Sequence, residues 1–235
     1  MAKQNKMSPA VARSSVGEIS AFLSKARQLQ AHSSGNRLLF ALDATASRQA
    51  TWDRACHLQA QMFAATRELS GLSIQLCYYR GIDEFQALPW SSNGPTLRQQ
   101  MLAVTCQGGH SQIERLLLHT LSQHQQASIR ALVFVGDAME EDSRRLYQLA
   151  GQLGIQRVPA FMFQEGFDTH AGQAFEQIAR LSGGVHCQFD ENSDKQLREL
   201  LTAVALYAAG GVDAVKQLEQ PSPLIRQLLK TLPGR

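Results

Sequence analysis

The stretch "LLFALDATAS", from Leu38 to Ser47, joins an apolar run to a polar loop. An apolar run of this kind, with no polar residue on either face, is typical of a parallel strand buried on both sides. The run stops at Asp43, and hydroxyl side chains follow at Thr45 and Ser47. The chain therefore leaves a hydrophobic core through one carboxylate and two hydroxyls, which indicates a polar site at the end of this strand.

Outward from this strand, apolar strand-like runs alternate with helix-like runs, and short turns join them. This alternation predicts right-handed βαβ units and an α/β fold with a doubly wound, mostly parallel sheet and helices on both faces. The segment 83–90 is a poorer strand with a proline near its end, which suits a sheet edge. The predicted strands are 37–44, 72–81, 83–90, 129–138, 157–166 and 185–190, and the predicted helices are 47–71, 95–106, 113–126, 140–154, 171–184 and 193–211.

The 235-residue chain is long enough for one domain with extensions. We expect a basic N-terminal arm and helix at 1–36, a central domain at 37–211 and a C-terminal helical tail at 212–235. The simplest interpretation of the basic segment is a solvated arm. The more specific alternative is an arm that docks to an acidic partner or to membrane headgroups. No apolar segment approaches the ~18 residues of a membrane span, and the basic N-terminus has no apolar signal region. We therefore expect a cytoplasmic protein with no membrane span.

The cysteines are isolated and form no C-x-x-C pair. We expect free thiols in a reducing cytosol, because this spacing fits neither a disulfide framework nor a structural zinc site. The four positions are Cys56, Cys77, Cys106 and Cys187.

A second strongly apolar strand, "ALVFVGDA", also ends in a carboxylate, Asp137. In doubly wound sheets, ligands bind beyond the carboxyl ends of the strands. If these two strands are central neighbours, Asp43 and Asp137 converge, and their repulsion needs a proton, a cation or solvent to offset it. The hydroxyls of Thr45 and Ser47, with Ser111 from the loop "GGHS", complete an all-oxygen set that suits Mg²⁺ or Mn²⁺.

These three elements resemble the motifs of von Willebrand factor A (VWA) domains. "DATAS" is similar to D-x-S-x-S, "GGHS" to G-G-x-T, and "VFVGDA" to an apolar strand that ends in T-D-G. The resemblance covers Leu38 to Gly210, and the layout is similar to that of small cytoplasmic bacterial VWA proteins. It implies a six-stranded sheet in the order 3-2-1-4-5-6, with strand 3 as the antiparallel edge. It also implies a metal-ion-dependent adhesion site (MIDAS) formed by Asp43, Thr45, Ser47, Ser111 and Asp137.

Each element also has a plainer interpretation. Asp43 could simply cap the following helix, and "GGHS" could be a helix-entry turn or a weak anion nest. The acids from Glu140 to Asp142 could begin a helix, where they favour its dipole, or could rim the site. We assign His110, Glu140 and Trp90 to a partner-binding rim, with a core position as the alternative for Trp90.

The resemblance implies a non-enzymatic, metal-dependent protein-binding module in which a partner's acidic residue completes the metal's coordination. A chaperone or AAA+ ATPase assembly is the context that the family implies. A phosphohydrolase with Asp43 as nucleophile is the alternative, but Thr45 stands where that chemistry needs an acid. The net charge of +3 is spread out and no nucleic-acid-binding motif is present, so we expect no nucleic-acid partner.

Overall fold

The computed structural model describes residues 36–50, 52, 72–189, 194–216, 225, 226 and 229. The expected N-terminal helix and most of the expected helix at 47–71, including Cys56, lie outside these residues. The other three cysteines are free thiols, as predicted.

The described chain is built on a six-stranded sheet in the order β3-β2-β1-β4-β5-β6. All neighbouring strands run parallel except the edge strand β3, which pairs antiparallel with β2. The predicted fold class and strand order are therefore confirmed. The strands are β1 (Asn36–Asp43), β2 (Leu72–Arg80), β3 (Glu84–Ala87), β4 (Ile129–Gly136), β5 (Ala160–Glu165) and β6 (His186–Phe189).

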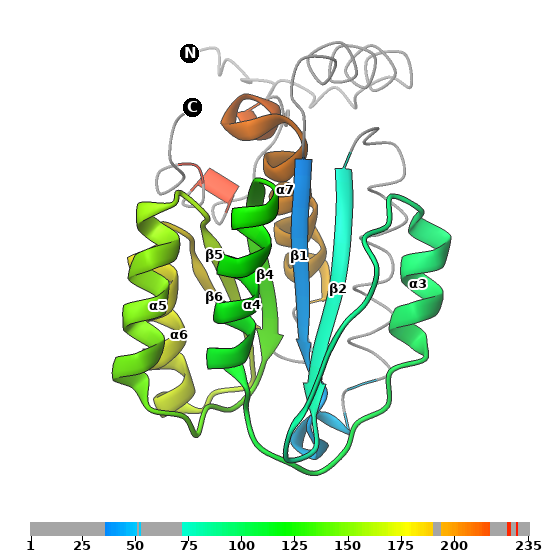
Figure 1. Ribbon diagram of the computed structural model, residues 1–235, viewed down its shortest axis with the longest axis vertical. Coiled ribbons are helices and arrows are strands. Elements are labelled where there is room, and N and C mark those ends of the chain that lie inside the picture. Colours follow the sequence, from blue (N-terminus) through cyan, green and yellow to red (C-terminus); the bar gives the residue numbers. More distant parts are fainter. Residues whose placement is uncertain are drawn as a thin grey trace, which may run out of the picture.

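Helices cover both faces of the sheet. The hydrophobic cluster on one face includes residues of α4 (Ile113–Gln126), α5 (Ser143–Ile155) and α6 (Thr169–Ser182). The cluster on the other face includes residues of α3 (Gly94–Leu102) and α7 (Asp194–Lys216). Figure 1 shows α4 in front of β4 and α7 passing behind β1.

Strand β1 illustrates why the sheet is buried on both sides. Leu38, Phe40 and Leu42 belong to the α3/α7 cluster, whereas Leu39 and Ala41 belong to the α4–α6 cluster. Because side chains alternate along a strand, Asp43 at the end of β1 falls on the α4–α6 side. The alternation of side chains along β1 thus decides on which face of the sheet the Asp43 carboxylate lies.

Local capping fixes where the helices begin and end. The carboxylates of Asp142 and Asp168 accept backbone N–H groups at the starts of α5 and α6, and Gly183 ends α6 with φ of 81°. Helix α5 begins at Ser143, later than predicted, because Glu140 and Glu141 bond elsewhere (below). Gly211, with φ of 71°, interrupts α7 at the boundary expected between domain and tail.

The described residues beyond Gly211 pack on the domain. Val215 and Ile225 are buried in the α3/α7 cluster, with 0% and 5% of their surface exposed. The domain limits themselves stay a prediction. None of the helices in the described ranges is long and apolar enough to cross a membrane.

Candidate functional site

The carboxyl ends of β1 and β4 form the candidate site. The two strands pair in register, with Leu42 opposite Val135, so Asp43 and the first residues after β4 lie side by side. A Cβ built on Gly136 would lie 3.2 Å from the Cβ of Asp43. The charge of Asp137 contributes to raising the pKa of Asp43. The expectation that these strands are central neighbours is confirmed, and the two carboxyl groups are close enough for their charges to interact.

The loop after β1 folds around the Asp43 carboxylate. Its Oδ1 accepts the backbone N–H of Thr45 at 2.8 Å, a local bond that is typical of aspartate at a turn. The hydroxyls of Thr45 and Ser47 lie 3.1 Å apart. One turn of 3₁₀ helix, η1 (Ala46–Arg48), then turns the chain away. Asp43 therefore caps its own turn and leaves the two hydroxyls beside its carboxylate.

Tyr79 supplies the second hydrogen bond to Asp43. Its hydroxyl, from the end of β2, donates to Asp43 Oδ2 at 3.0 Å inside the core. Asp43 is 1% exposed, and this burial raises its pKa from 3.8 to about 6, against the bonds from Thr45 and the charge of Arg48. Burial also raises the pKa of Tyr79 well above its ordinary value, so Tyr79 stays a donor. The carboxylate is thus held in place but only partly compensated.

Asp137 has less support than Asp43. Its Oδ1 is buried and has no hydrogen-bond partner among the described residues. Burial raises the pKa of Asp137, while the Ser47 hydroxyl and the Arg48 charge oppose that rise. A buried carboxylate oxygen without a donor is costly unless a cation, a proton or water reaches it.

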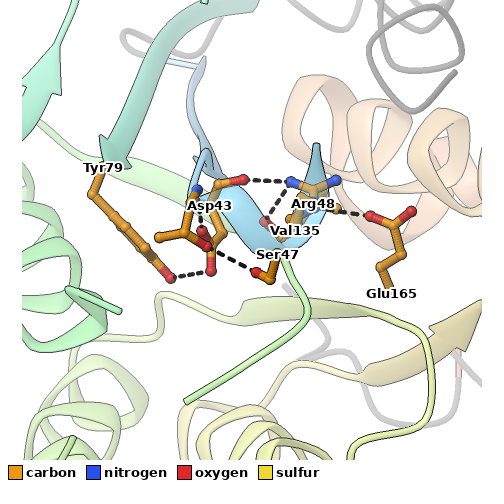
Figure 2. A network of polar contacts seen from close by, with 7 residues as sticks. Asp43, Ser47, Arg48, Tyr79, Val135 and Glu165 are labelled. Atoms are coloured by element: carbon orange, nitrogen blue, oxygen red, sulfur yellow. Dashed lines mark hydrogen bonds and ion pairs between the residues drawn. The ribbon is translucent and has the colours of Figure 1, made fainter. Parts of the chain in front are cut away.

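Arg48 is a buried cation that the sequence interpretation missed. It is 1% exposed, and its Nη1 donates to the carbonyl oxygens of Asp43, at 2.6 Å, and of Val135, at 3.4 Å. Its Nε donates to Glu165 Oε2 at 2.8 Å, and its guanidinium lies 5.2 Å from the Trp52 ring centroid. Figure 2 shows Glu165 reaching Arg48 from one side while Tyr79 approaches Asp43 from the other. Arg48 thereby ties together the ends of β1, β4 and β5.

Glu165 could have been predicted from the same sequence signal as Asp43 and Asp137. It is the last residue of the apolar strand β5, so a third strand also ends in a carboxylate at this edge. Arg48, directly after "DATAS", is the basic residue that such an additional acid needs.

Ser111 makes a different set of contacts. Its hydroxyl accepts the backbone N–H of Glu140 at 3.0 Å, and its own N–H donates to Glu140 Oε2 at 2.9 Å. None of the hydrogen bonds described joins Ser111 to Asp43, Thr45, Ser47 or Asp137. Glu140 therefore lies against Ser111. The other four predicted site residues, Asp43, Thr45, Ser47 and Asp137, lie at or just beyond the ends of β1 and β4.

The start of α4 is capped by the neighbouring acid, Glu141. Its carboxylate accepts the backbone N–H groups of Ile113, at 2.6 Å, and Glu114, at 2.8 Å. The expectation that the whole acid run begins its own helix is wrong, because only Asp142 caps α5. The anion nest considered for the "GGHS" loop is thus filled by the chain's own Glu141.

The "GGHS" loop is pressed against the turn after β2. A side chain on Gly109 would collide with the carbonyl oxygen of Gly81, so only glycine fits there. The backbone N–H of His110 donates to the same carbonyl at 3.3 Å. His110 itself is exposed at the carboxyl edge of the sheet, on the predicted rim.

Trp90 lies far from the site. Its indole N–H donates to Gln123 near the end of α4, at 3.1 Å, and the Arg37 guanidinium lies 4.7 Å from its ring centroid. Arg37 is at the beginning of β1 and Asp43 at its end, so the two ends lie roughly 20 Å apart along the strand. The rim assignment of Trp90 is wrong, and its half-buried position against the α4–α6 cluster matches the alternative.

The gathered side chains fit a hard cation. Among the described residues, no group of three or more His, Cys, Asp or Glu side chains is arranged to hold a metal. A cation here would rely on two carboxylates, two hydroxyls and water, which is the oxygen chemistry that Mg²⁺ and Mn²⁺ accept. The unpartnered Oδ1 of Asp137 is the position that a cation would satisfy. We call Asp43, Thr45, Ser47 and Asp137 the oxygen cup.

Comparison with known proteins gives structural likeness only. No protein-family model matches the chain, and no curated protein matches it. The SpRpn10 VWA domain is similar, with a TM-score of 0.54 and 11% identity over 74% of this chain and 97% of that domain. The ArnB paralog VWA2 from Sulfolobus acidocaldarius has a TM-score of 0.51 and 16% identity over 73% of this chain and 45% of that protein.

A further similar structure is proximal thread matrix protein 1 from the mussel byssus with a zinc-occupied MIDAS motif. Its TM-score is 0.56, with 12% identity over 73% of this chain. The match spans 45% of the length of that protein. Together with the strand order, these likenesses show that the chain has a VWA-like fold.

Proposed function

We propose that this chain is a metal-dependent protein-interaction module. The oxygen cup binds a divalent cation, Mg²⁺ or Mn²⁺, and the bound cation accepts a carboxylate from a protein partner. The observation that carries this proposal is the buried Oδ1 of Asp137, which has no described donor and lies beside a second buried carboxylate. The VWA-like fold and the zinc-occupied MIDAS motif of one structural neighbour support it.

The cup's chemistry explains why a partner is needed. Two carboxylates and neutral hydroxyls do not fill the coordination of a hard dication, and Mg²⁺ usually keeps several waters. A partner carboxylate that replaces one water gains a charge-assisted contact with the cation. It would approach from the side of the cup that faces away from the hydrophobic core. We further propose, from the family resemblance, a cytoplasmic multiprotein assembly such as a chaperone or AAA+ ATPase complex, with Ser111 and Glu140 as support for the cup.

The test is a calorimetric titration of metal-stripped protein with Mg²⁺, Mn²⁺ and Zn²⁺ in separate runs. Wild type and the variants Asp43→Asn and Asp137→Asn are compared, with unfolding curves to show that each is folded. We expect one saturable site in wild type and its loss in both variants. Asp83→Asn is the matched control, because Asp83 is an exposed acid on the turn after β2 and its loss changes the charge equally. Equal binding by Asp137→Asn and wild type would contradict the proposed cup.

A further inference from the structure

Two large apolar side chains are exposed at the edge of the sheet that carries the oxygen cup. Ile82 is 83% exposed and Phe167 is 70% exposed. Ile82 follows the end of β2, and Phe167 follows the end of β5. Both residues therefore lie at the carboxyl edge of the sheet, the edge to which β1 and β4 bring Asp43 and Asp137.

The turn that carries Ile82 is anchored on both sides. Before it, Gly81 adopts φ of 61° and its carbonyl accepts the N–H of His110. After it, the backbone carbonyl of Asp83 accepts a hydrogen bond from Arg115 Nη1 at 3.1 Å. Ile82 is thus held out toward solvent by a fixed backbone.

The turn that carries Phe167 is anchored in a similar way. Gly166 adopts φ of 76°, and its N–H donates to the carbonyl of Phe189 at 3.0 Å. Asp168 caps α6, and its carbonyl accepts a hydrogen bond from the buried Gln164 at 2.6 Å. Because its backbone is fixed, the exposed ring can give a partner apolar contact area without the cost of ordering the turn on binding.

These two side chains flank the cup. In the strand order, β2 and β5 lie immediately outside β1 and β4. Three inter-strand spacings separate β2 from β5, or about 14 Å. Both turns also lead toward the α4–α6 side of the sheet, the side on which Asp43 falls, because Gly81 contacts the loop into α4 and Phe167 leads into α6.

We propose that Ile82 and Phe167 select the partner: an extended peptide segment with a carboxylate residue and apolar residues two positions before and after it. Side chains two positions apart in an extended chain share one face and lie about 7 Å apart, so the two apolar residues are separated by about 13 Å. That span is close to the three inter-strand spacings between β2 and β5, the strands that lead to Ile82 and Phe167, and it puts the carboxylate midway, beyond β1 and β4. This inference rests on the proposed function, because the central carboxylate is the one that the bound cation accepts.

The probe is a displayed library of random twelve-residue peptides, selected on Mn²⁺-loaded wild-type protein and eluted with a chelator. We expect the recovered peptides to share an Asp or Glu with apolar residues at positions −2 and +2. A synthetic peptide of the recovered sequence is then titrated into the double variant Ile82→Ser/Phe167→Ser. Its affinity should fall roughly tenfold or more, because two apolar contacts are lost.

Ile155→Ser is the matched control. Ile155 is 85% exposed but lies at the end of α5, on the opposite edge of the sheet. This variant should bind the peptide as tightly as wild type. Recovered acidic peptides with no apolar preference, or equal loss of affinity in Ile155→Ser, would overturn this inference and leave the proposed function standing. A library that yields no chelator-eluted peptide would overturn both.

Discussion

The Nε of Arg48 lies 2.8 Å from Oε2 of Glu165, and this ion pair joins the loop after β1 to the end of β5. The Arg48 side chain is 0% exposed and the Glu165 side chain 14% exposed, so water reaches the pair only from the Glu165 side. Because Arg48 also bonds the carbonyl of Asp43, the pair fixes the backbone from which the oxygen cup is built.

Breaking this pair should destabilise the fold. Arg48→Met removes the cation and leaves Glu165 without its partner beside the buried Asp43 and the half-buried Asp137, which should lower the free energy of unfolding by about 3 kcal/mol. Glu165→Gln should cost less, because Glu165 is partly solvated. Urea unfolding of both single variants and of the double variant Arg48→Met/Glu165→Gln measures the coupling. Additive effects would contradict a cooperative pair.

The single variant Arg48→Met should bind metal more tightly. Burial raises the pKa of Asp43 and of Asp137, and the Arg48 charge opposes that rise, so this charge also repels a cation in the cup. Removing it while Glu165 keeps its negative charge should raise the affinity for Mn²⁺ roughly tenfold. Arg48→Lys retains the charge and is the control for altered packing. An Arg48→Met protein with unchanged or weaker Mn²⁺ binding would show that Arg48 does not compete with the cation.

Asp43 should make the metal-free protein less stable as the pH rises. Its pKa is about 6 in the fold against an ordinary 3.8, so the folded state holds the proton more tightly than the unfolded chain. The folded state is therefore favoured most below pH 4 and loses stability as the pH rises through 6. Asp43→Asn lacks this loss, and its unfolding free energy relative to wild type should rise by up to about 3 kcal/mol between pH 4 and pH 7. Urea unfolding with chelator at both pH values checks this, and a difference that does not vary with pH would contradict it.

Gly136 should be intolerant of a side chain. A Cβ there would lie 2.6 Å from the Phe134 ring and 3.2 Å from the Cβ of Asp43. Gly136→Ala should therefore cost about 1–3 kcal/mol of stability and weaken Mn²⁺ binding by displacing Asp43. Gly151→Ala in α5 is the matched control, since its added Cβ meets no atom within 4 Å apart from the adjacent backbone of its own helix. It should leave metal binding unchanged and raise stability slightly, because alanine favours a helix. Equal effects of the two substitutions would contradict the crowding at Gly136.

The fold followed from local patterns because its strands are buried in a regular way. The unbroken apolar runs that begin at Leu38 and Ala131 predicted central parallel strands, and Pro89 marked the poor edge strand. The start of α5 was missed because Glu140 and Glu141 bond to the loop and helix that precede β4. Long-range bonds of this kind leave no periodic signal in the sequence.

The site was only partly predictable for a related reason. Asp43 and Asp137 end the two central strands, so topology alone brought them together. Trp90 was wrongly assigned to the rim of the site. Its ring lies beside Arg37, which is at the opposite end of β1 from Asp43. The role of Arg48 was not predicted, since a basic residue after a polar loop is usually solvated. Its burial is offset by the third terminal acid, Glu165, and by the carbonyls of Asp43 and Val135.

The most direct test of the oxygen cup is a crystal structure of the protein grown with Mn²⁺, with the metal located by its anomalous scattering. We predict one strong peak beyond the ends of β1 and β4, within coordination distance of side-chain oxygens from the group Asp43, Thr45, Ser47 and Asp137. The same crystals of Asp137→Asn protein should lack it. No peak at this place in wild type, or a peak that persists unchanged in Asp137→Asn, would contradict the central claim.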